Sequence, residues 1–92
     1  MYKIFETEKF AQSLKQDFGG KREKIINKLR EYVYPQLKES PGYGSNIRKL
    51  REWVPFTWRY RIGDYRFFYE IDFENQIVFM LLAEHRSTAY KK

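Results

Sequence analysis

Hydrophobic and polar positions in the first part of the chain follow the spacing of one short strand and one helix. Residues 2–6 alternate weakly between apolar and polar side chains, which predicts an opening strand. Thr7 is placed as an N-cap, and the apolar side chains behind it recur every four residues. These side chains are Phe10, Leu14 and Phe18. We therefore expect an amphipathic helix over about 8–18 that ends at Gly19-Gly20.

A second apolar stripe with helical spacing begins near Lys21. Its members are Ile25, Ile26, Leu29, Val33 and Leu37. Lys and Arg dominate the other face. Pro35 has no backbone N–H, so we expect the helix to kink there or to end near Tyr34. Two helices joined by Gly-Gly predict an antiparallel helical hairpin.

The second half of the chain changes to the spacing of strands. Residues 40–45 (SPGYGS) are typical of a loop. Over 56–62, large apolar side chains alternate with arginines, and Gly63-Asp64 is typical of a two-residue hairpin turn. Residues 65–71, which are mostly aromatic, form the return strand.

A last strand is predicted over 77–83 (IVFMLLA), after a turn at 72–76. Because this run is almost continuously apolar, we expect a central strand that is buried on both faces. The tail, 84–92, is polar with one Tyr. The order strand, helix, helix and three strands predicts an α+β fold, with a mostly antiparallel sheet and the helical hairpin packed on one face. We expect the first strand to pair with one of the last three, and the whole of 1–92 to form a single domain.

Composition narrows the chemistry. The chain has no Cys and one His, which excludes a disulfide framework, thiol catalysis, Cys-based zinc or iron–sulfur sites and a multi-histidine metal site. Eighteen basic residues against twelve acidic ones give a net charge of +6, which favours a polyanionic partner such as nucleic acid, a ribosome or an acidic protein. Many small soluble domains are also basic, so charge alone does not choose among these classes. No apolar run resembles a membrane span and the N-terminal residues turn charged at once, so we expect a cytoplasmic protein.

The two halves differ in the kind of basic residue. Lys supplies seven of the nine basic residues in 1–46, whereas Arg supplies six of the nine in 47–92. Arg binds phosphate with a bidentate fork, whereas Lys is a solvated point charge. We therefore expect solvated helix faces and a sheet that binds phosphate.

The predicted hairpin gathers three arginines. Arg59 and Arg61 share one strand face, and the two-residue turn places Arg61 opposite Arg66. Like charges directly opposite one another are destabilising, which favours an anionic ligand. Glu70 falls on the same face and compensates in part. The alternative is an exposed sheet face with solvated arginines.

The C-terminal segment adds groups that could move protons. His85 carries the side-chain type best suited to proton transfer near neutral pH, and Arg86 and Tyr90 follow it. If this segment folds over the arginines, the set suits cleavage of RNA by its own 2′-hydroxyl without a metal. A lone His is more often structural, which is the competing interpretation.

Three stretches taken in order resemble the RelE/ParE superfamily of type II toxin–antitoxin toxins. They are IRKL, WRYRIGDYRFFYEID and LLAEHRSTAY, and the predicted element order is also that of the family. RelE-type members are mRNA interferases, so the resemblance implies an endoribonuclease that enters the ribosomal A site, contacts 16S/23S rRNA, cuts mRNA and needs no cofactor.

The resemblance also implies roles for single residues. Arg66 matches the arginine that contacts the scissile phosphate, and Arg59 and Arg61 match the preceding basic pair that binds RNA. The remaining matches are Lys49 of the Lys-Leu pair, His85 as acid or base, Arg86, and Tyr90 as the residue that stacks on or orients the RNA. Glu84 stands where the prototype has a further arginine, so a carboxylate is a third candidate for acid or base.

Two other functions stay open. The ParE branch shares the fold but inhibits DNA gyrase and is not a nuclease, and a plain basic RNA-binding domain would not be toxic. In the toxin interpretations, the partner is an acidic, partly helical antitoxin that wraps around a monomeric toxin. Trp53, Phe56 and Trp58 could anchor that partner, although the two Trp side chains could equally belong to the core.

Overall fold

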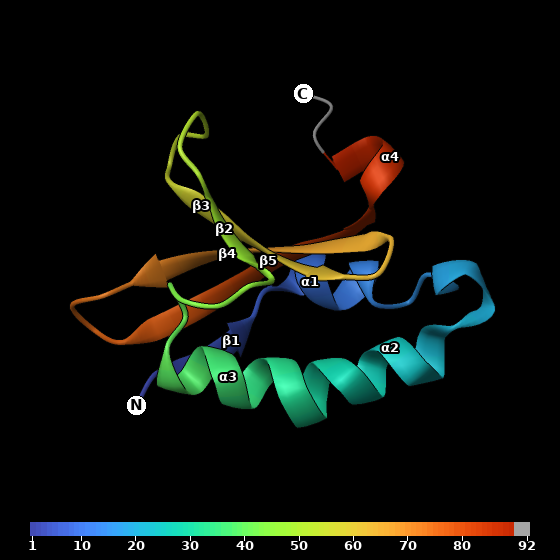
Figure 1. Ribbon diagram of the computed structural model, residues 1–92, viewed down its shortest axis with the longest axis horizontal. Coiled ribbons are helices and arrows are strands. Elements are labelled where there is room, and N and C mark those ends of the chain that lie inside the picture. The colour runs from blue at the N-terminus through green and yellow to red at the C-terminus, as the bar shows by residue number, and fades with distance from the viewer. Residues whose placement is uncertain (90–92) are drawn as a thin grey trace.

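Five strands form one sheet in the computed structural model, which describes residues 1–89. Their order across the sheet is β1-β5-β4-β3-β2. The strands are β1 Lys3–Glu6, β2 Ile47–Leu50, β3 Thr57–Ile62, β4 Tyr65–Asp72 and β5 Ile77–His85. β1 runs parallel to β5, and the other neighbouring pairs are antiparallel. The predicted α+β class and the pairing of the first strand with one of the last are confirmed (Figure 1).

The helical segments, with the exception of the last one, contribute their buried side chains to one core on a single face of the sheet. They are α1 Glu8–Ser13, the 3-10 turn η1 Phe18–Gly20, α2 Arg22–Lys28, the π-helical turn η2 Leu29–Val33, α3 Tyr34–Glu39 and α4 Arg86–Ala89. α2, η2 and α3 follow one another without a break and form one long helix beneath the sheet (Figure 1). Across residues 1–89, none of the helices has the length and apolar character that crossing a membrane requires.

α1 is shorter than the predicted helix, because side chains take over the carbonyl groups at its end. The Ser13 hydroxyl donates to the Phe10 carbonyl, and the Arg22 Nε donates to the Leu14 carbonyl at 2.7 Å. The chain then turns into η1, where Phe18 and Gly19 both have positive φ. The apolar side chains that predicted one helix to residue 18 therefore belong to a helix and a separate turn. Phe18 is buried although it lies in the turn.

Pro35 does not end the second helix, which runs on to Glu39. The turn before it is π-helical, and the Tyr34 backbone N–H donates to the carbonyl of Leu29, five residues back. Pro35 consequently lies in the first turn of α3, where a missing N–H is tolerated. We expected the helix to kink at this proline or to end near Tyr34. The helix does not end there, because the wider π-helical turn accommodates the proline ring.

Strand β2 and helix α4 were not predicted. β2 is a four-residue edge strand with charged residues at its centre, Arg48 and Lys49, and such residues are typical of edges that must resist pairing with other chains. α4 occupies part of the polar tail, for which no element was predicted. The predicted order therefore lacks one strand between the long helix and the hairpin.

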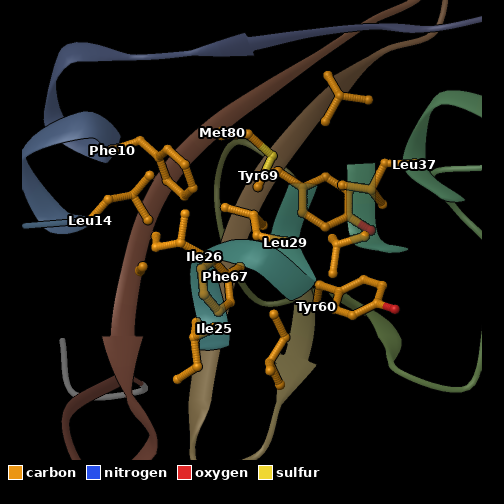
Figure 2. Packing of buried hydrophobic residues seen from close by; sticks show 14 of the residues in the cluster. Phe10, Leu14, Ile25, Ile26, Leu29, Leu37, Tyr60, Phe67, Tyr69 and Met80 are labelled. Carbon is orange, nitrogen blue, oxygen red and sulfur yellow. The ribbon is translucent and has the colours of Figure 1, made fainter. Parts of the chain in front are cut away.

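The core lies between the helices and one face of the sheet (Figure 2). Phe10 of α1 and Leu29 and Leu37 of the long helix meet Phe67 and Tyr69 of β4, and all five are fully buried. Burying a side chain of this size contributes about 1.5–3 kcal/mol. Trp58 packs against this core, as one of the two sequence interpretations expected, whereas Trp53 lies on the opposite face of the sheet, stacked on Phe68.

β5 is not buried on both faces, contrary to the prediction. Val78, Met80 and Ala83 are buried against the helices, whereas Phe79 and Leu82 are half-exposed on the other face. α1, α2 and α3 lie against one face of the sheet, whereas α4 stands on the side opposite the long helix (Figure 1). The second apolar face of β5 therefore points away from the core, and we call that side of the sheet the open face.

We expect Tyr69→Phe to lower the free energy of unfolding by about 1–2 kcal/mol. The Tyr69 hydroxyl is buried and donates to the Pro41 carbonyl at 2.7 Å, which would lose its partner. Burial raises the pKa of this hydroxyl, so it stays a neutral donor in ordinary buffers. Urea unfolding measures the change, with Tyr43→Phe as the control because Tyr43 is 81% exposed. Equal losses in the two variants would contradict this account of the core.

Candidate nucleic-acid interface

Four arginines lie on the open face across three neighbouring strands. Arg61 is directly opposite Arg66, which confirms the predicted hairpin register. Arg59 lies two residues before Arg61 and is opposite Arg48 of the edge strand β2. Because cross-strand partners share a face, we call Arg48, Arg59, Arg61 and Arg66 the arginine cluster. Arg48 joins it only through β2, the strand that the sequence did not reveal.

Two of the four guanidinium groups in the cluster donate to backbone carbonyl groups. The Arg59 Nη1 donates to the Asn46 carbonyl at 2.9 Å, and its Nε is buried without a partner within the described chain. The Arg66 Nη1 donates to the carbonyls of Gly63 and Tyr65 at 3.0 and 3.2 Å. Arg61 is exposed. Across residues 1–89 the one ion pair joins Arg86 to Asp64, so no carboxylate there forms an ion pair with the cluster.

Two carboxylates share the open face with the arginine cluster. Glu84 of β5 is the cross-strand neighbour of Arg66, and Glu70 of β4 pairs with Phe79 of β5. Both are half-exposed, and neither forms an ion pair with the cluster. Glu84 therefore places an acceptor for a proton beside Arg66, where an anion could bind.

His85 lies on the helix side of the sheet, away from the arginine cluster. Its ring packs edge-on against Tyr65, with centroids 5.2 Å apart. The Nδ1 atom accepts the backbone N–H of Ser87 at 3.1 Å, which leaves the proton of the neutral ring on Nε2. The expectation that the C-terminal segment lies over the arginines is thus not met by His85.

An extra residue in β5 is the reason for this reversal. Phe68 pairs with Leu82 and Tyr69 pairs with Met80, so Leu81 has no partner and forms a bulge. Side chains alternate along a strand, and one added residue moves all later ones to the opposite face. The bulge therefore directs Glu84 to the open face and His85 to the helix side.

The other predicted site residues have different positions. Arg86 lies at the hairpin turn. Its backbone N–H donates to the Asp64 carbonyl at 2.7 Å, and its side-chain Nε is 3.5 Å from Asp64 Oδ1. Lys49 is on the opposite face from the arginine cluster, with its Nζ 4.3 Å from the centroid of the Phe56 ring. Tyr90 lies outside the described residues.

Aromatic side chains extend the open face beyond the arginine cluster. Phe5 of β1 contacts Phe79 of β5 edge-on, with centroids 5.7 Å apart, and Phe5 is 54% exposed. Trp53 stacks on Phe68 at 5.1 Å. Sequence reasoning missed the Phe5 and Phe79 pair because β5 was expected to be covered on both sides. A face that combines exposed rings with arginines can bind nucleotide bases together with phosphates.

Comparison with known proteins places the chain in a family. The family model described as the ParE toxin of the type II toxin–antitoxin system parDE matches residues 6–90. The chain belongs to this family, and the expected membership of the RelE/ParE superfamily is confirmed. The protein is therefore a toxin of a type II toxin–antitoxin system.

Solved structures show the same fold. A chain of the toxin–antitoxin complex RelBE2 from Mycobacterium tuberculosis is 26% identical with a TM-score of 0.72, covering 92% of this chain and 98% of that one. A metal-bound toxin from Helicobacter pylori is 18% identical with a TM-score of 0.71, covering 98% and 100%. A chain of the RelB–RelE antitoxin–toxin complex from Methanococcus jannaschii is 21% identical with a TM-score of 0.64, covering 94% of each chain. The last two are similar in fold alone, and a search of curated proteins gave no match.

We expect Arg61→Gln to raise the free energy of unfolding by about 0.5 kcal/mol at low salt, because it removes a like charge opposite Arg66. The gain should shrink at high salt, which screens exposed charges. Chemical denaturation at two ionic strengths measures both effects. Arg51→Gln is the matched control, since Arg51 is exposed and lies outside the strands. A loss of stability in Arg61→Gln would mean that Arg61 serves the fold instead of a ligand.

Proposed function

We propose that this toxin is an endoribonuclease that cuts mRNA at the arginine cluster. The observation that carries the proposal is the unneutralised pair Arg61 and Arg66 with the Glu84 carboxylate beside it on the same face. Charges held in this way favour an anion that gains charge during a reaction. The 26% identity to a chain of RelBE2 is consistent with this branch of the superfamily.

In the proposed reaction the RNA supplies its own nucleophile. The Glu84 carboxylate takes the proton of the 2′-hydroxyl, and O2′ forms a bond to the adjacent phosphorus. Arg61 and Arg66 stabilise the added negative charge on the phosphorane. The bond from phosphorus to O5′ then breaks, and an acid protonates the leaving oxygen. The products are a 2′,3′-cyclic phosphate and a 5′-hydroxyl.

Two residues are candidates for the acid. Tyr90 is implied by the resemblance to RelE-type toxins and lies outside the described residues. His85 is on the helix side, so it would have to reach the leaving oxygen around the end of β5. The variants Tyr90→Phe and His85→Gln separate them when the RNA is saturating, because loss of the acid lowers kcat, whereas loss of a group that only binds RNA raises KM.

The substrate and the partner follow from the same face. We propose mRNA in the ribosomal A site as the substrate, with 16S/23S rRNA providing further contacts to this basic chain. We propose that the cognate antitoxin is an acidic protein that covers the arginine cluster and the exposed rings of the open face. Two of the similar structures are complexes of a toxin with its antitoxin.

A second candidate function is inhibition of DNA gyrase without nuclease activity. The match to the ParE family model favours it, and the fold would be the same. It would not require the Glu84 carboxylate, which distinguishes the two functions by experiment.

Induced expression in bacteria tests the proposed nuclease. We expect the wild type to arrest growth and to produce cuts in a reporter mRNA, mapped by primer extension. Glu84→Gln should lower the rate of cleavage about 10²-fold or more, because it removes the base. Arg66→Ala should also abolish the cuts. Glu74→Gln, which changes an exposed carboxylate in a turn, is the matched control and should stay toxic.

Two results would contradict the nuclease. Growth arrest with intact mRNA and inhibited DNA supercoiling would establish the gyrase function instead. Normal growth with soluble protein would also contradict the proposed nuclease.

A further inference from the structure

A second basic site lies on the helix side of the sheet, behind the hairpin turn. A pocket of about 430 Å³ opens between α2 and the end of the β3–β4 hairpin. Figure 1 shows the start of α2 and this hairpin turn at the same end of the molecule. Its polar walls come from three lysines, Asp64, Tyr65 and His85. Phe18, Ile25 and Ile62 form its apolar base.

The charges around this pocket are unbalanced. Lys21, Lys24 and Lys28 follow one edge of α2, and none of them forms an ion pair in the part of the chain that the structure describes. The one carboxylate that lines the pocket is Asp64, which is paired with Arg86. Like charges four residues apart on a helix, such as Lys24 and Lys28, are destabilising. A site that concentrates this charge beside a cavity suits an anion.

The side chains of the sheet complete a site for a nucleotide. His85 lines the pocket, and its Nδ1 is occupied by the Ser87 N–H, so the Nε2–H is the ring's remaining donor. The Tyr65 ring lies between Phe18 and His85, with centroid distances of 4.9 and 5.2 Å. A donor and an aromatic wall beside lysines can hold a phosphate together with the sugar or base attached to it.

The pocket and the arginine cluster share one boundary, the hairpin turn. Gly63 lines the pocket, and its carbonyl accepts a hydrogen bond from Arg66 on the open face. An RNA strand that leaves Arg66 and passes over this turn would therefore enter the pocket directly. The sequence predicted that the lysines of the helices are solvated, and Lys21, Lys24 and Lys28 are indeed exposed where they line the pocket.

We propose that the pocket binds a phosphate of the same RNA strand whose neighbouring phosphate lies at Arg61 and Arg66. This inference rests on the proposed function, since it places one substrate strand across both faces of the hairpin. The lysines of the pocket hold the strand and take no part in the reaction by which O2′ attacks phosphorus.

Binding without cleavage tests the pocket. The probe is a labelled 2′-O-methyl oligoribonucleotide of about eight nucleotides, a length within the usual range for single-strand sites. Its methylated oxygens cannot attack phosphorus. Fluorescence anisotropy at several salt concentrations gives the affinity and the slope of its logarithm against the logarithm of salt concentration.

We expect the double variant Lys24→Gln and Lys28→Gln to bind about tenfold more weakly and to lower the slope by about 0.7, because one phosphate contact is lost. The matched control is Lys9→Gln with Lys15→Gln, the same charge change on exposed lysines away from the pocket. Thermal unfolding checks that all variants are folded. Equal affinity and slope in the two double variants would overturn the proposal.

The single His of the chain supplies a second readout. We expect the ring proton signals of His85 to move in NMR spectra when the oligonucleotide binds, and to move less in the Lys24 and Lys28 variant. Signals that stay in place at saturation would overturn the proposal. Adenosine monophosphate is tested in the same way. If it moves the His85 signals at concentrations as low as those of the oligonucleotide, the pocket binds a free nucleotide and the proposal of one RNA strand across both sites is overturned.

A double variant of the arginine cluster separates the test of the pocket from the test of the proposed nuclease. Arg61→Gln with Arg66→Gln should also weaken binding of the oligonucleotide. If it binds like wild type while the Lys24 and Lys28 variant does not, the arginine cluster is not the phosphate site and the strand does not span the turn. If only the arginine variant loses affinity, the pocket is overturned and the proposed nuclease site stands.

Discussion

The position of one unpaired residue in strand β5 determines which side chains each face of the sheet presents. Leu81 forms a bulge in β5, and the alternation of side chains shifts by one position after it. Before the bulge, Val78 and Met80 point into the core, and after it Ala83 does so. The same shift turns Glu84 toward Arg66 and His85 toward the helices. Core packing and the candidate site are therefore fixed by the same backbone irregularity.

The open face combines features that do not favour stability. Arginines lie opposite arginines, and aromatic rings such as Phe5 remain exposed where a simple globular domain would cover them. Large exposed rings beside unneutralised charge are typical of binding surfaces. The core on the other side of the sheet is closed around Phe67 and Tyr69. Its stability offsets the repulsion between arginines and the exposure of rings on the open face.

The sequence was informative where local geometry fixes the outcome. A two-residue turn at Gly63-Asp64 determines the register of its hairpin, so the pair Arg61 and Arg66 could be placed correctly. The bulge could not be predicted, because the run IVFMLLA contains no polar residue to mark which side chains face the helices. β2 was missed because an edge strand of four residues with Arg48 and Lys49 lacks the usual apolar alternation.

Long-range contacts account for the remaining differences. The end of α1 depends on Arg22, which binds the Leu14 carbonyl from the next helix. The path of the long helix past Pro35 depends on a π-helical turn, which no spacing of apolar residues indicates. In the same way, the lysines of α2 acquire a shared pocket only because the hairpin turn folds back over them.

In the proposed function, Glu84 and the arginine cluster cut RNA through its own 2′-hydroxyl. The most direct measurement is the chemical analysis of the ends produced when purified toxin acts on programmed ribosomes. We predict 2′,3′-cyclic phosphate and 5′-hydroxyl ends from the wild type, and none from Glu84→Gln. Ends carrying a 5′-phosphate, or cyclic ends that persist in Glu84→Gln, would contradict the account.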